Sequence, residues 1–285
     1  MRRFLLLMMV IFSGVLAVSC SSNENMPTDE DNYDAIIERG YIVVGMECAY
    51  APFNWTVSES AAFEGAVSIE GTNNLADGYD VMVAQAIADG LGVDLVIQAV
   101  EWGGLIPSLA DTGEIDLIIA GMSPTAERAQ TVAFSNSYYQ STHVVVLRTD
   151  SDFADAESIE DFTAASVVAQ LSTIYDGLVD QMTGATHENP LEDVPTIITG
   201  ISAGTYDATI LELPVALAVI ESNPELTYIQ FTEGNGFEVS FEDSAVSIAL
   251  RQSETTLLAE INEILATITT ETRETLMLEA ISRQP

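Results

Sequence analysis

The chain has 285 residues, of which 48% are hydrophobic, and a formal net charge of −36 from 44 acidic and eight basic residues, none of them lysine. This length suits about two domains, and the hydrophobic content is ample for a folded core. So few cations cannot neutralise phosphates, which excludes a nucleic-acid-binding protein. We attribute the dispersed acidity to a solvated surface that maintains solubility; salt adaptation and weak steering of cationic solutes are the alternatives.

The N-terminus has the pattern of a secretory signal. Residues 1–3 are positively charged, and the apolar run over 4–18 is shorter than the ~20 residues of a membrane span. The small residues before Cys20 resemble a bacterial lipobox, although Ala17 stands where leucine is usual. A plain cleavable signal or an uncleaved anchor is the alternative. We predict a lipoprotein signal peptide over 1–20, acylation of Cys20, and a flexible polar tether over 21–33.

Next along the chain, predicted strands and helices alternate. Tyr41–Gly45 is rich in β-branched residues, which indicates a strand, and Pro52 prevents a helix in the segment after it. Asp80 precedes apolar residues at helical spacing and is expected to cap that helix. The predicted elements are a helix over 33–39, a strand over 41–45, a hairpin or loop over 57–77 with weak strands near 66–69, a helix over 81–91, a strand over 93–97, a helix over 105–111 and a strand over 115–120. This order predicts a parallel, doubly wound α/β lobe.

The segment Gly121–Gln130 follows the last of these strands and is the most informative in the sequence. Ser123 precedes a proline, and Thr125 is placed to cap a helix that begins at Ala126. Unpaired backbone N–H groups beside the Arg128 guanidinium would form a carboxylate site. The alternative is that Arg128 is a solvated helix residue.

A second α/β series begins near residue 142 and has no detectable sequence repeat of the first. The predicted elements are strands over 142–147, 166–169, 206–210, 226–231 and 244–250, and helices over 174–182, 196–203, 215–221, 254–268 and 272–283.

In this order, the motifs resemble those of the bacterial extracellular solute-binding proteins of family 3, the amino-acid-binding proteins of ABC importers. The matching segments are Tyr41–Gly45, Tyr50–Phe53, Gly78–Asp80, Trp102–Leu109, Gly113–Asp116, Gly121–Arg128, Phe134–Ser135, Tyr138–Tyr139, Gln170–Thr173 and Tyr206–Ala208. The resemblance implies an α/β, two-lobed periplasmic-binding-protein-like fold of type 2, with two doubly wound lobes joined by a two-segment hinge. The implied boundaries are 34–141 with 243–285 for lobe 1, 142–242 for lobe 2, and hinges near 140–142 and 241–245.

The resemblance also implies a binding site for a free amino acid. Arg128 would take the ligand carboxylate with backbone N–H groups of Ser123 and Thr173, and Glu212 would take the ammonium group. The Ser123 hydroxyl and the Gly121 carbonyl would complete the ammonium subsite, and Tyr50 and Trp102 would enclose the ligand side chain. The expected ligand-binding residues are Glu47, Tyr50, Trp102, Gly121, Met122, Ser123, Arg128, Gln170, Ser172, Thr173 and Glu212.

Glu47 bears on the ligand's identity. An acid at this position would pair with an ammonium or guanidinium, so a basic or polar amino acid is expected. The alternatives are a glutamine-type ligand or a Glu47 side chain that points outward. The loop over 57–77 is longer than the family leads us to expect, and at the rim of the cleft it would alter access or selectivity.

The favoured function is extracytoplasmic capture of an amino acid by a lipid-anchored monomer, and its delivery to an ABC transporter permease. We expect no enzymatic activity, cofactor or metal. The first alternative is a periplasmic dehydratase-like enzyme, for which Glu47 and Glu212 are the candidate acids or bases, whereas His143 and His187 are expected to be structural or exposed. The second alternative is a ligand-sensing subunit on the same fold.

Overall fold

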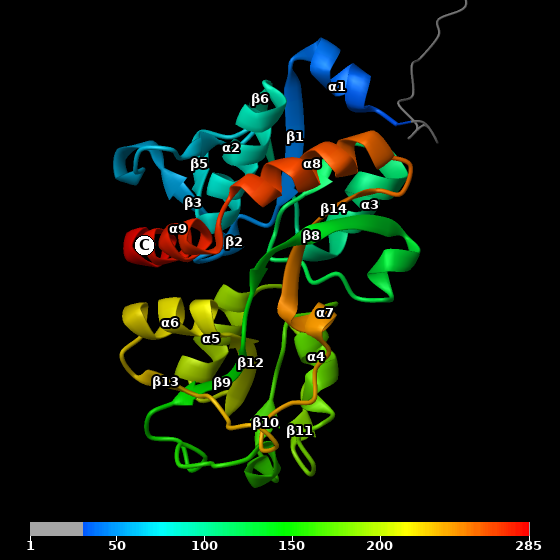
Figure 1. Ribbon diagram of the computed structural model, residues 1–285. Coiled ribbons are helices and arrows are strands. Elements are labelled where there is room, and N and C mark those ends of the chain that lie inside the picture. Colours follow the sequence, from blue (N-terminus) through cyan, green and yellow to red (C-terminus); the bar gives the residue numbers. More distant parts are fainter. Residues whose placement is uncertain (1–30, 285) are drawn as a thin grey trace, which may run out of the picture.

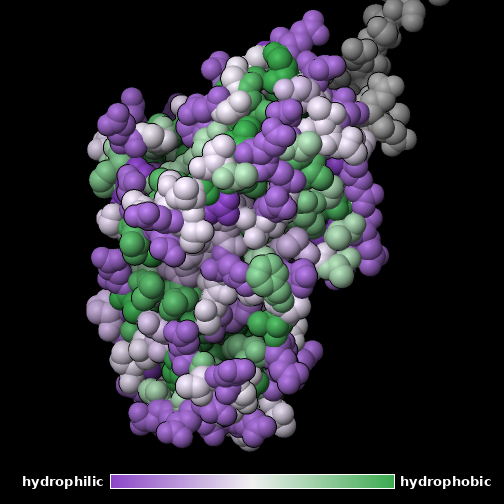
Figure 2. Space-filling model, viewed as in Figure 1, coloured by the Kyte–Doolittle hydropathy of each residue, from purple (hydrophilic) through white to green (hydrophobic). Residues whose placement is uncertain are grey.

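The computed structural model describes residues 31–284, which form two lobes, one above the other (Figure 1). The predicted signal peptide, Cys20 and most of the predicted tether lie outside the described residues. None of the helices in 31–284 has the length and apolar character needed to cross a bilayer. Hydrophilic residues cover much of the face in Figure 2, as the acidic composition leads one to expect.

Lobe 1 is built on a five-stranded sheet in the order β6-β1-β7-β14-β8. β1, β6 and β7 are parallel, and β14 pairs antiparallel with both β7 and β8. The strands are β1 (Tyr41–Met46), β6 (Asp94–Ala99), β7 (Leu117–Ile118), β8 (Val132–Gln140) and β14 (Ala245–Arg251). The helices of this lobe are α1 (Tyr33–Arg39), α2 (Tyr79–Leu91), α3 (Leu105–Pro107), α8 (Thr255–Thr267) and α9 (Thr270–Arg283).

Lobe 2 is built on a second five-stranded sheet in the order β11-β10-β12-β9-β13. Every residue of β12 is buried, because helices cover both faces of this central strand. The strands are β9 (His143–Arg148), β10 (Ser166–Val167), β11 (Thr186–His187), β12 (Ala208–Glu212) and β13 (Leu226–Ile229). The helices are α4 (Ile174–Val179), α5 (Val194–Ser202) and α6 (Leu213–Ser222), and α7 (Phe241–Ser244) leads back to lobe 1.

Two chain segments connect the lobes and lie side by side. One runs from β8 to β9, and the other runs through α7 into β14 (Figure 1). The Ser141 N–H donates to the Ser244 carbonyl at 3.0 Å, and Gln140 faces Ala245 across the β8–β14 ladder. Two adjacent crossings of this kind form a hinge about which the lobes can rotate as rigid bodies.

A four-stranded sheet of order β2-β3-β5-β4 extends lobe 1 and includes three short parts of the long 57–77 segment. Its strands are β2 (Ala49–Tyr50), β3 (Asn54–Ser58), β4 (Val67–Ser68) and β5 (Asn74–Asp77), so the weak strands predicted near 66–69 are present. Arg283 of α9 fastens this segment, since its guanidinium lies 3.6 Å from Asp77, 3.1 Å from the Glu64 carbonyl and 5.8 Å from the ring of Phe63.

Most predicted elements are present with shifted ends, but three local predictions were wrong. Asp80 does not cap α2, which begins at Tyr79; it is buried in the first turn and accepts hydrogen bonds from Asn54 and Tyr138 at 2.8 and 2.6 Å. The helix expected from Ala126 is a turn followed by a 3-10 turn at Arg128–Gln130, although the Thr125 hydroxyl does accept from the Arg128 N–H at 3.2 Å.

The third difference concerns the end of the predicted tether at residues 31–33. The Asn32 N–H donates to Glu254 at 2.7 Å, and Asp31 accepts hydrogen bonds from the Tyr33 N–H at 3.1 Å and from the first turn of α8. Tyr33 already belongs to α1. The chain is therefore attached to lobe 1 from Asp31 onward, and only residues before 31 remain as candidates for a tether.

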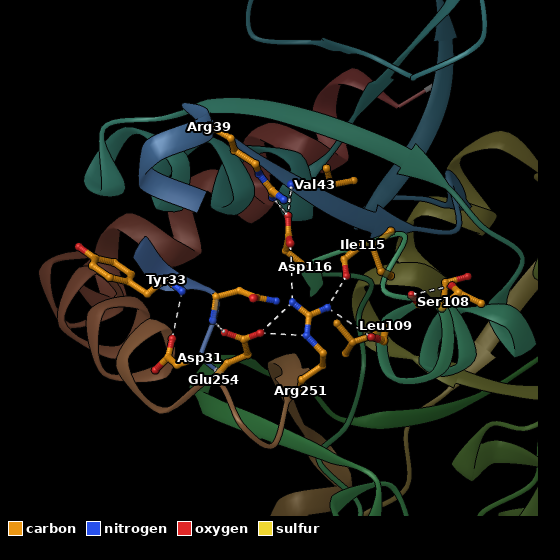
Figure 3. A network of polar contacts seen from close by, with 12 residues as sticks. Asp31, Tyr33, Arg39, Val43, Ser108, Leu109, Ile115, Asp116, Arg251 and Glu254 are labelled. Atoms are coloured by element: carbon orange, nitrogen blue, oxygen red, sulfur yellow. Dashed lines mark hydrogen bonds and ion pairs between the residues drawn. The ribbon is translucent and has the colours of Figure 1, made fainter. Parts of the chain in front are cut away.

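A buried polar network holds the start of the chain against the centre of lobe 1 (Figure 3). Arg251 at the end of β14 is 6% exposed and lies 2.8 Å from Glu254 and 3.7 Å from Asp116. It also donates to the carbonyls of Ile115 and Leu109 at 2.9 and 3.3 Å. Asp116 in turn pairs with Arg39 and accepts from the Val43 N–H, so one network joins α1, β1, β14 and the segment before β7.

We predict that Arg251→Met destabilises the protein strongly. The substitution leaves Glu254, which is 1% exposed, buried without its cation, and such losses cost about 3 to 5 kcal/mol. Urea unfolding gives the free energy directly. Asp150→Asn is the matched control, because it removes one partner of an exposed ion pair with Arg148 and should change the unfolding free energy by less than about 1 kcal/mol. Equal effects of the two substitutions would contradict the prediction.

Candidate ligand-binding site

The candidate site lies between the lobes, where segments that follow several strands meet. Gly121–Arg128 follows β7, Gln170–Thr173 follows β10, and Glu212 ends β12. Ligands of open α/β sheets bind at this carboxyl edge. The lobes enclose a cavity of about 20 Å³. The lining residues are Glu47, Tyr50, Trp102, Gly121, Ser123, Arg128, Gln170, Thr173, Ile174, Tyr175 and Glu212.

Nine of the eleven residues expected from the sequence therefore line one cavity, and two do not. Met122 is 1% exposed and belongs to the core, and its carbonyl accepts from the Ser247 N–H at 2.9 Å. Ser172 contributes its backbone carbonyl to the cleft, from a residue with φ +62°. The sequence reasoning missed Ile174 and Tyr175, although their position in the first turn after Thr173 was a usable signal.

A cavity of this size has room for about one water molecule. An amino acid can enter only when the lobes separate. Four hydrogen bonds cross between the lobes at the cleft, and each joins a residue of lobe 1 to a residue of lobe 2. The pairs are Tyr50–Glu212, Glu47–Gln170, Trp102–Ser172 and Arg128–Ser172, at 2.8, 2.9, 3.1 and 3.1 Å.

Arg128 carries the positive charge of the site. Its guanidinium donates to the carbonyls of Ser123 and Ser172 at 2.9 and 3.1 Å and lies 5.1 Å from the centre of the Trp102 ring. Burial lowers the pKa of Arg128, since charge is costly away from water. Within residues 31–284, no carboxylate lies within ion-pair distance of this guanidinium. A half-buried cation with only neutral acceptors is a strong attractor for an anion.

Glu212 carries a negative charge on the opposite lobe. It is 3% exposed, and its two carboxylate oxygens accept hydrogen bonds from Tyr50 and Tyr175 at 2.8 and 2.6 Å. Burial raises the pKa of Glu212 to about 7, while the two phenol donors counteract part of that rise. Among the described residues, Glu212 also has no cationic partner. Glu212 is therefore a buried acid of the site rather than one of the solvated surface acids.

Glu47 is the second acid of the cavity and accepts a hydrogen bond from Gln170 at 2.9 Å. Burial raises the pKa of Glu47 to about 7, and repulsion from Asp193 adds to the rise. The same Gln170 amide nitrogen donates to the Glu192 carbonyl at 3.0 Å, which fixes the orientation of the amide. Glu47 therefore faces the cleft rather than solvent.

Several groups make contacts other than those the sequence reasoning assigned to them. The Ser123 hydroxyl donates to the Asp243 carbonyl at 3.1 Å, and the Thr173 N–H is directed to the Gln170 carbonyl at 3.4 Å. The Tyr50 ring stacks on Phe53 at 5.6 Å, and it lies so close to Gly121 that an added Cβ there would be 3.1 Å from it. Of the two predicted enclosing aromatics, Trp102 places its ring against the Arg128 guanidinium, whereas Tyr50 contacts Glu212 through its hydroxyl.

The loop over 57–77 was expected at the rim of the cleft, where it would alter access or selectivity. None of these residues, all of which the structure describes, lines the cavity, because Arg283 holds the segment against α9.

His143 is buried in the hinge strand, where burial lowers its pKa to about 4, and His187 lies between Asp176 and Asp180. In the part of the chain that the structure describes, no cluster of His, Cys, Asp and Glu is suited to a metal ion.

Comparison with known proteins agrees with this geometry. Residues 42–279 match the model of the bacterial extracellular solute-binding proteins, family 3, and the chain belongs to this family. One relative is a probable histidine-binding protein of Campylobacter jejuni, 26% identical over 85% of this chain and 87% of its own length. Another is the L-cystine-binding protein TcyJ of Escherichia coli, 25% identical over 89% of this chain and 87% of its own length.

Solved structures show the same two-lobed fold. A Streptococcus pneumoniae amino acid ABC transporter substrate-binding protein bound to L-arginine matches with a TM-score of 0.74 and 26% identity, over 89% of this chain and 98% of that protein. The ancestral amino acid-binding protein AncCDT-1, a precursor of cyclohexadienyl dehydratase, matches with a TM-score of 0.71 and 25% identity, over 88% and 100% of the two chains. The type 2 periplasmic-binding-protein fold expected from the sequence is confirmed.

We predict that Glu212 makes the protein less stable as the pH rises. In the folded protein the pKa of the Glu212 carboxyl is about 7, above the ordinary value of 4.5, so the folded state favours the protonated acid. The resulting stabilisation is complete below pH 4.5 and is lost as the pH rises through 7. Between pH 5 and 8 the unfolding free energy should fall by about 2 to 3 kcal/mol more in the wild type than in Glu212→Gln.

Urea unfolding at the two pH values measures this difference. Glu70→Gln is the matched control, because Glu70 is exposed and the variant should keep the wild-type pH dependence. A Glu212→Gln variant with the same pH dependence as the wild type would show that the buried carboxyl does not titrate in this range.

Proposed function

We propose that the protein captures a free basic amino acid outside the cytoplasm and delivers it to an ABC importer. One observation supports this most strongly. Arg128, Glu47 and Glu212 all line one enclosed cavity, and none has an ion-pair partner among residues 31–284. Buried charges without partners are costly, so a site of this kind is completed by a ligand of opposite charges.

The charges of the site are the complement of a basic amino acid. The site offers one cation and two acids, and such a ligand has one carboxylate and two cationic groups. We assign the ligand carboxylate to Arg128, the α-ammonium group to Glu212, and the side-chain cation to Glu47. A planar guanidinium matches a carboxylate in two hydrogen bonds, so L-arginine is the first candidate.

The comparisons support this class of ligand without fixing one amino acid. A structure with L-arginine bound and a probable histidine-binding protein favour a basic side chain. An L-cystine-binding protein of similar identity favours a longer side chain that ends in both an ammonium group and a carboxylate. The acid Glu47 decides between them in our proposal, because the second carboxylate of cystine would enter a cavity whose lining already has two acids and one cation.

Ligand capture follows from the hinge and the distribution of charges. Arg128 and Glu47 belong to lobe 1 and Glu212 to lobe 2, so a ligand that contacts all three favours the closed arrangement. We propose lobe boundaries at 34–141 with 243–285 and at 142–242. Delivery by a monomer anchored to the membrane through Cys20 is part of the same proposal.

A dehydratase-like enzyme is the second candidate, since the ancestor of one such enzyme is among the similar structures. Glu47 and Glu212 are the carboxyl groups in the cavity, and pKa values of about 7 suit an acid or base. We favour binding because the AncCDT-1 neighbour is itself described as an amino acid-binding protein. Conversion of a cyclohexadienyl acid by the purified protein would overturn this choice.

The proposed function predicts a selective thermal stabilisation by free amino acids. At about 100 times its dissociation constant, the ligand should add ~2.7 kcal/mol to the unfolding free energy. We expect L-arginine, L-lysine or L-histidine to raise the melting temperature, and L-cystine and neutral amino acids to have a smaller effect. Arg128→Met should abolish the shift, whereas Arg148→Met, outside the cavity, should retain it. No shift with any free amino acid would refute the proposal.

Glu47 should determine the preference for a cationic side chain. Glu47→Gln should weaken L-arginine binding by about tenfold or more, since it replaces a charge-assisted interaction by a neutral one, and should change binding of L-glutamine much less. Titration calorimetry with both amino acids measures the ratio. Glu192→Gln is the matched control, because the Glu192 side chain is exposed on the neighbouring loop. Equal losses for both ligands would mean that Glu47 does not contact the ligand side chain.

A further inference from the structure

Tyr175 was not among the ligand-binding residues expected from the sequence, yet it makes the shortest contact to the buried acid of lobe 2. Its hydroxyl donates to Glu212 Oε1 at 2.6 Å, and the Tyr50 hydroxyl donates to Oε2 at 2.8 Å. Tyr175 is 6% exposed and lines the ligand cavity beside Glu212. Each carboxylate oxygen of Glu212 therefore accepts a hydrogen bond from a different phenol.

The two phenols differ in the lobe from which they come. Tyr50 belongs to lobe 1 and reaches Glu212 across the cleft, so this contact depends on closure. Tyr175 lies in the first turn of α4, in the same lobe as Glu212, and its ring packs edge-on against His143 at 5.5 Å. The contacts of Tyr175 with Glu212 and His143 lie within lobe 2, so Tyr175 remains beside Glu212 when the lobes separate, whereas its interaction with the Tyr50 hydroxyl across the cleft is lost.

The Glu212 side chain does not interact with the N-terminus of the helix that follows it. It stands at the N-cap of α6, yet its side chain makes no capping hydrogen bond. Asp193, at the N-cap of α5 in the same lobe, does cap its helix, accepting from the Thr196 N–H at 2.7 Å. The Glu212 carboxylate is turned away from its helix and toward the cleft, where Tyr175 is its donor from the same lobe.

We propose that Tyr175 is a positioning residue that fixes Glu212 through Oε1, so that Oε2 faces lobe 1 and receives the ammonium group of the ligand. This inference rests on the proposed function for the identity of that group. Tyr50 then either competes with the ligand ammonium group for Glu212 Oε2 or binds this oxygen together with it. Tyr175 contacts Oε1 and does not compete with the ligand.

The arrangement has a consequence for the charge of Glu212. Burial favours the neutral acid, and a phenol that donates to the carboxylate favours the ionised form. Removing the Tyr175 hydroxyl should therefore raise the pKa of Glu212 further above 7. Since an ammonium group binds the ionised acid, the loss should be greatest at low pH and should diminish as the pH rises.

Tyr175→Phe tests the proposal because it keeps the ring and its contact with His143. In protein labelled with ¹³C at the glutamate side-chain carboxyl, the Glu212 signal is identified by its loss in Glu212→Gln. We expect its titration midpoint to rise by about one pH unit in Tyr175→Phe. Tyr228→Phe, on β13 outside the cavity, is the matched control and should leave the midpoint unchanged. Melting temperatures establish that both variants are folded.

Binding of L-arginine provides the second measurement, at pH 6.5 and pH 8. The dissociation constant should increase about tenfold in Tyr175→Phe at pH 6.5 and by a smaller factor at pH 8. An unchanged Glu212 midpoint, or an equal loss of affinity at both pH values, would show that Tyr175 only fills space. If the wild type binds no free amino acid, the proposed function fails, while the carboxyl titration still decides whether Tyr175 acts on Glu212.

Discussion

Placing the buried carboxylate of Glu212 and the half-buried charged groups of Arg128 and Glu47 where two lobes meet is energetically costly, and neutral partners surround all three. Carbonyl oxygens from both lobes surround Arg128, a glutamine amide reaches Glu47, and phenols donate to Glu212. All these partners are neutral. They orient the charged groups without neutralising them, so the strongest available electrostatic partner is a ligand with the opposite charges.

Lobe 1 also contains the buried Arg251, whose partners differ from those of the half-buried Arg128. Arg251 has Glu254 and Asp116 beside it, together with two backbone carbonyls, and it joins segments from both ends of the chain (Figure 3). Arg128 has carbonyls and an aromatic ring but, within 31–284, no acid. The same side chain thus stabilises the fold where its counter-ion belongs to the protein, and forms a binding site where the counter-ion must come from outside.

The closed cleft also shows how binding is coupled to domain motion. Each acid of the cavity is hydrogen-bonded by a residue of the opposite lobe, Gln170 for Glu47 and Tyr50 for Glu212. Separation of the lobes breaks these contacts and leaves the carboxylates accessible. A ligand that replaces them must contact both lobes, so capture and closure are one process rather than two.

Much of the fold and part of the site followed from the sequence. The alternation of β-branched strands with amphipathic helices determined the two α/β lobes, because that pattern can bury its apolar faces only in a layered sheet. The order of motifs placed Arg128, Glu212 and Glu47 at carboxyl ends of strands, and these residues do line one cavity. Local geometry was harder to predict from the sequence. Asp80 was expected to cap a helix, but it is a buried hydrogen-bond acceptor for Asn54 and Tyr138.

What only the tertiary structure decided are the contacts between residues far apart in the chain. Nothing in the local sequence brings Tyr50 or Tyr175 to Glu212, since 162 and 37 residues separate the partners. The 57–77 segment was expected at the cleft, and Arg283 at the other end of the chain holds it elsewhere. Periodicity and turn chemistry act over a few residues, so the sequence determined the elements and the candidate charges. Long-range packing decides whether a charged side chain has a partner of opposite charge within the protein. Arg251 has such a partner, and Arg128 has none among the described residues.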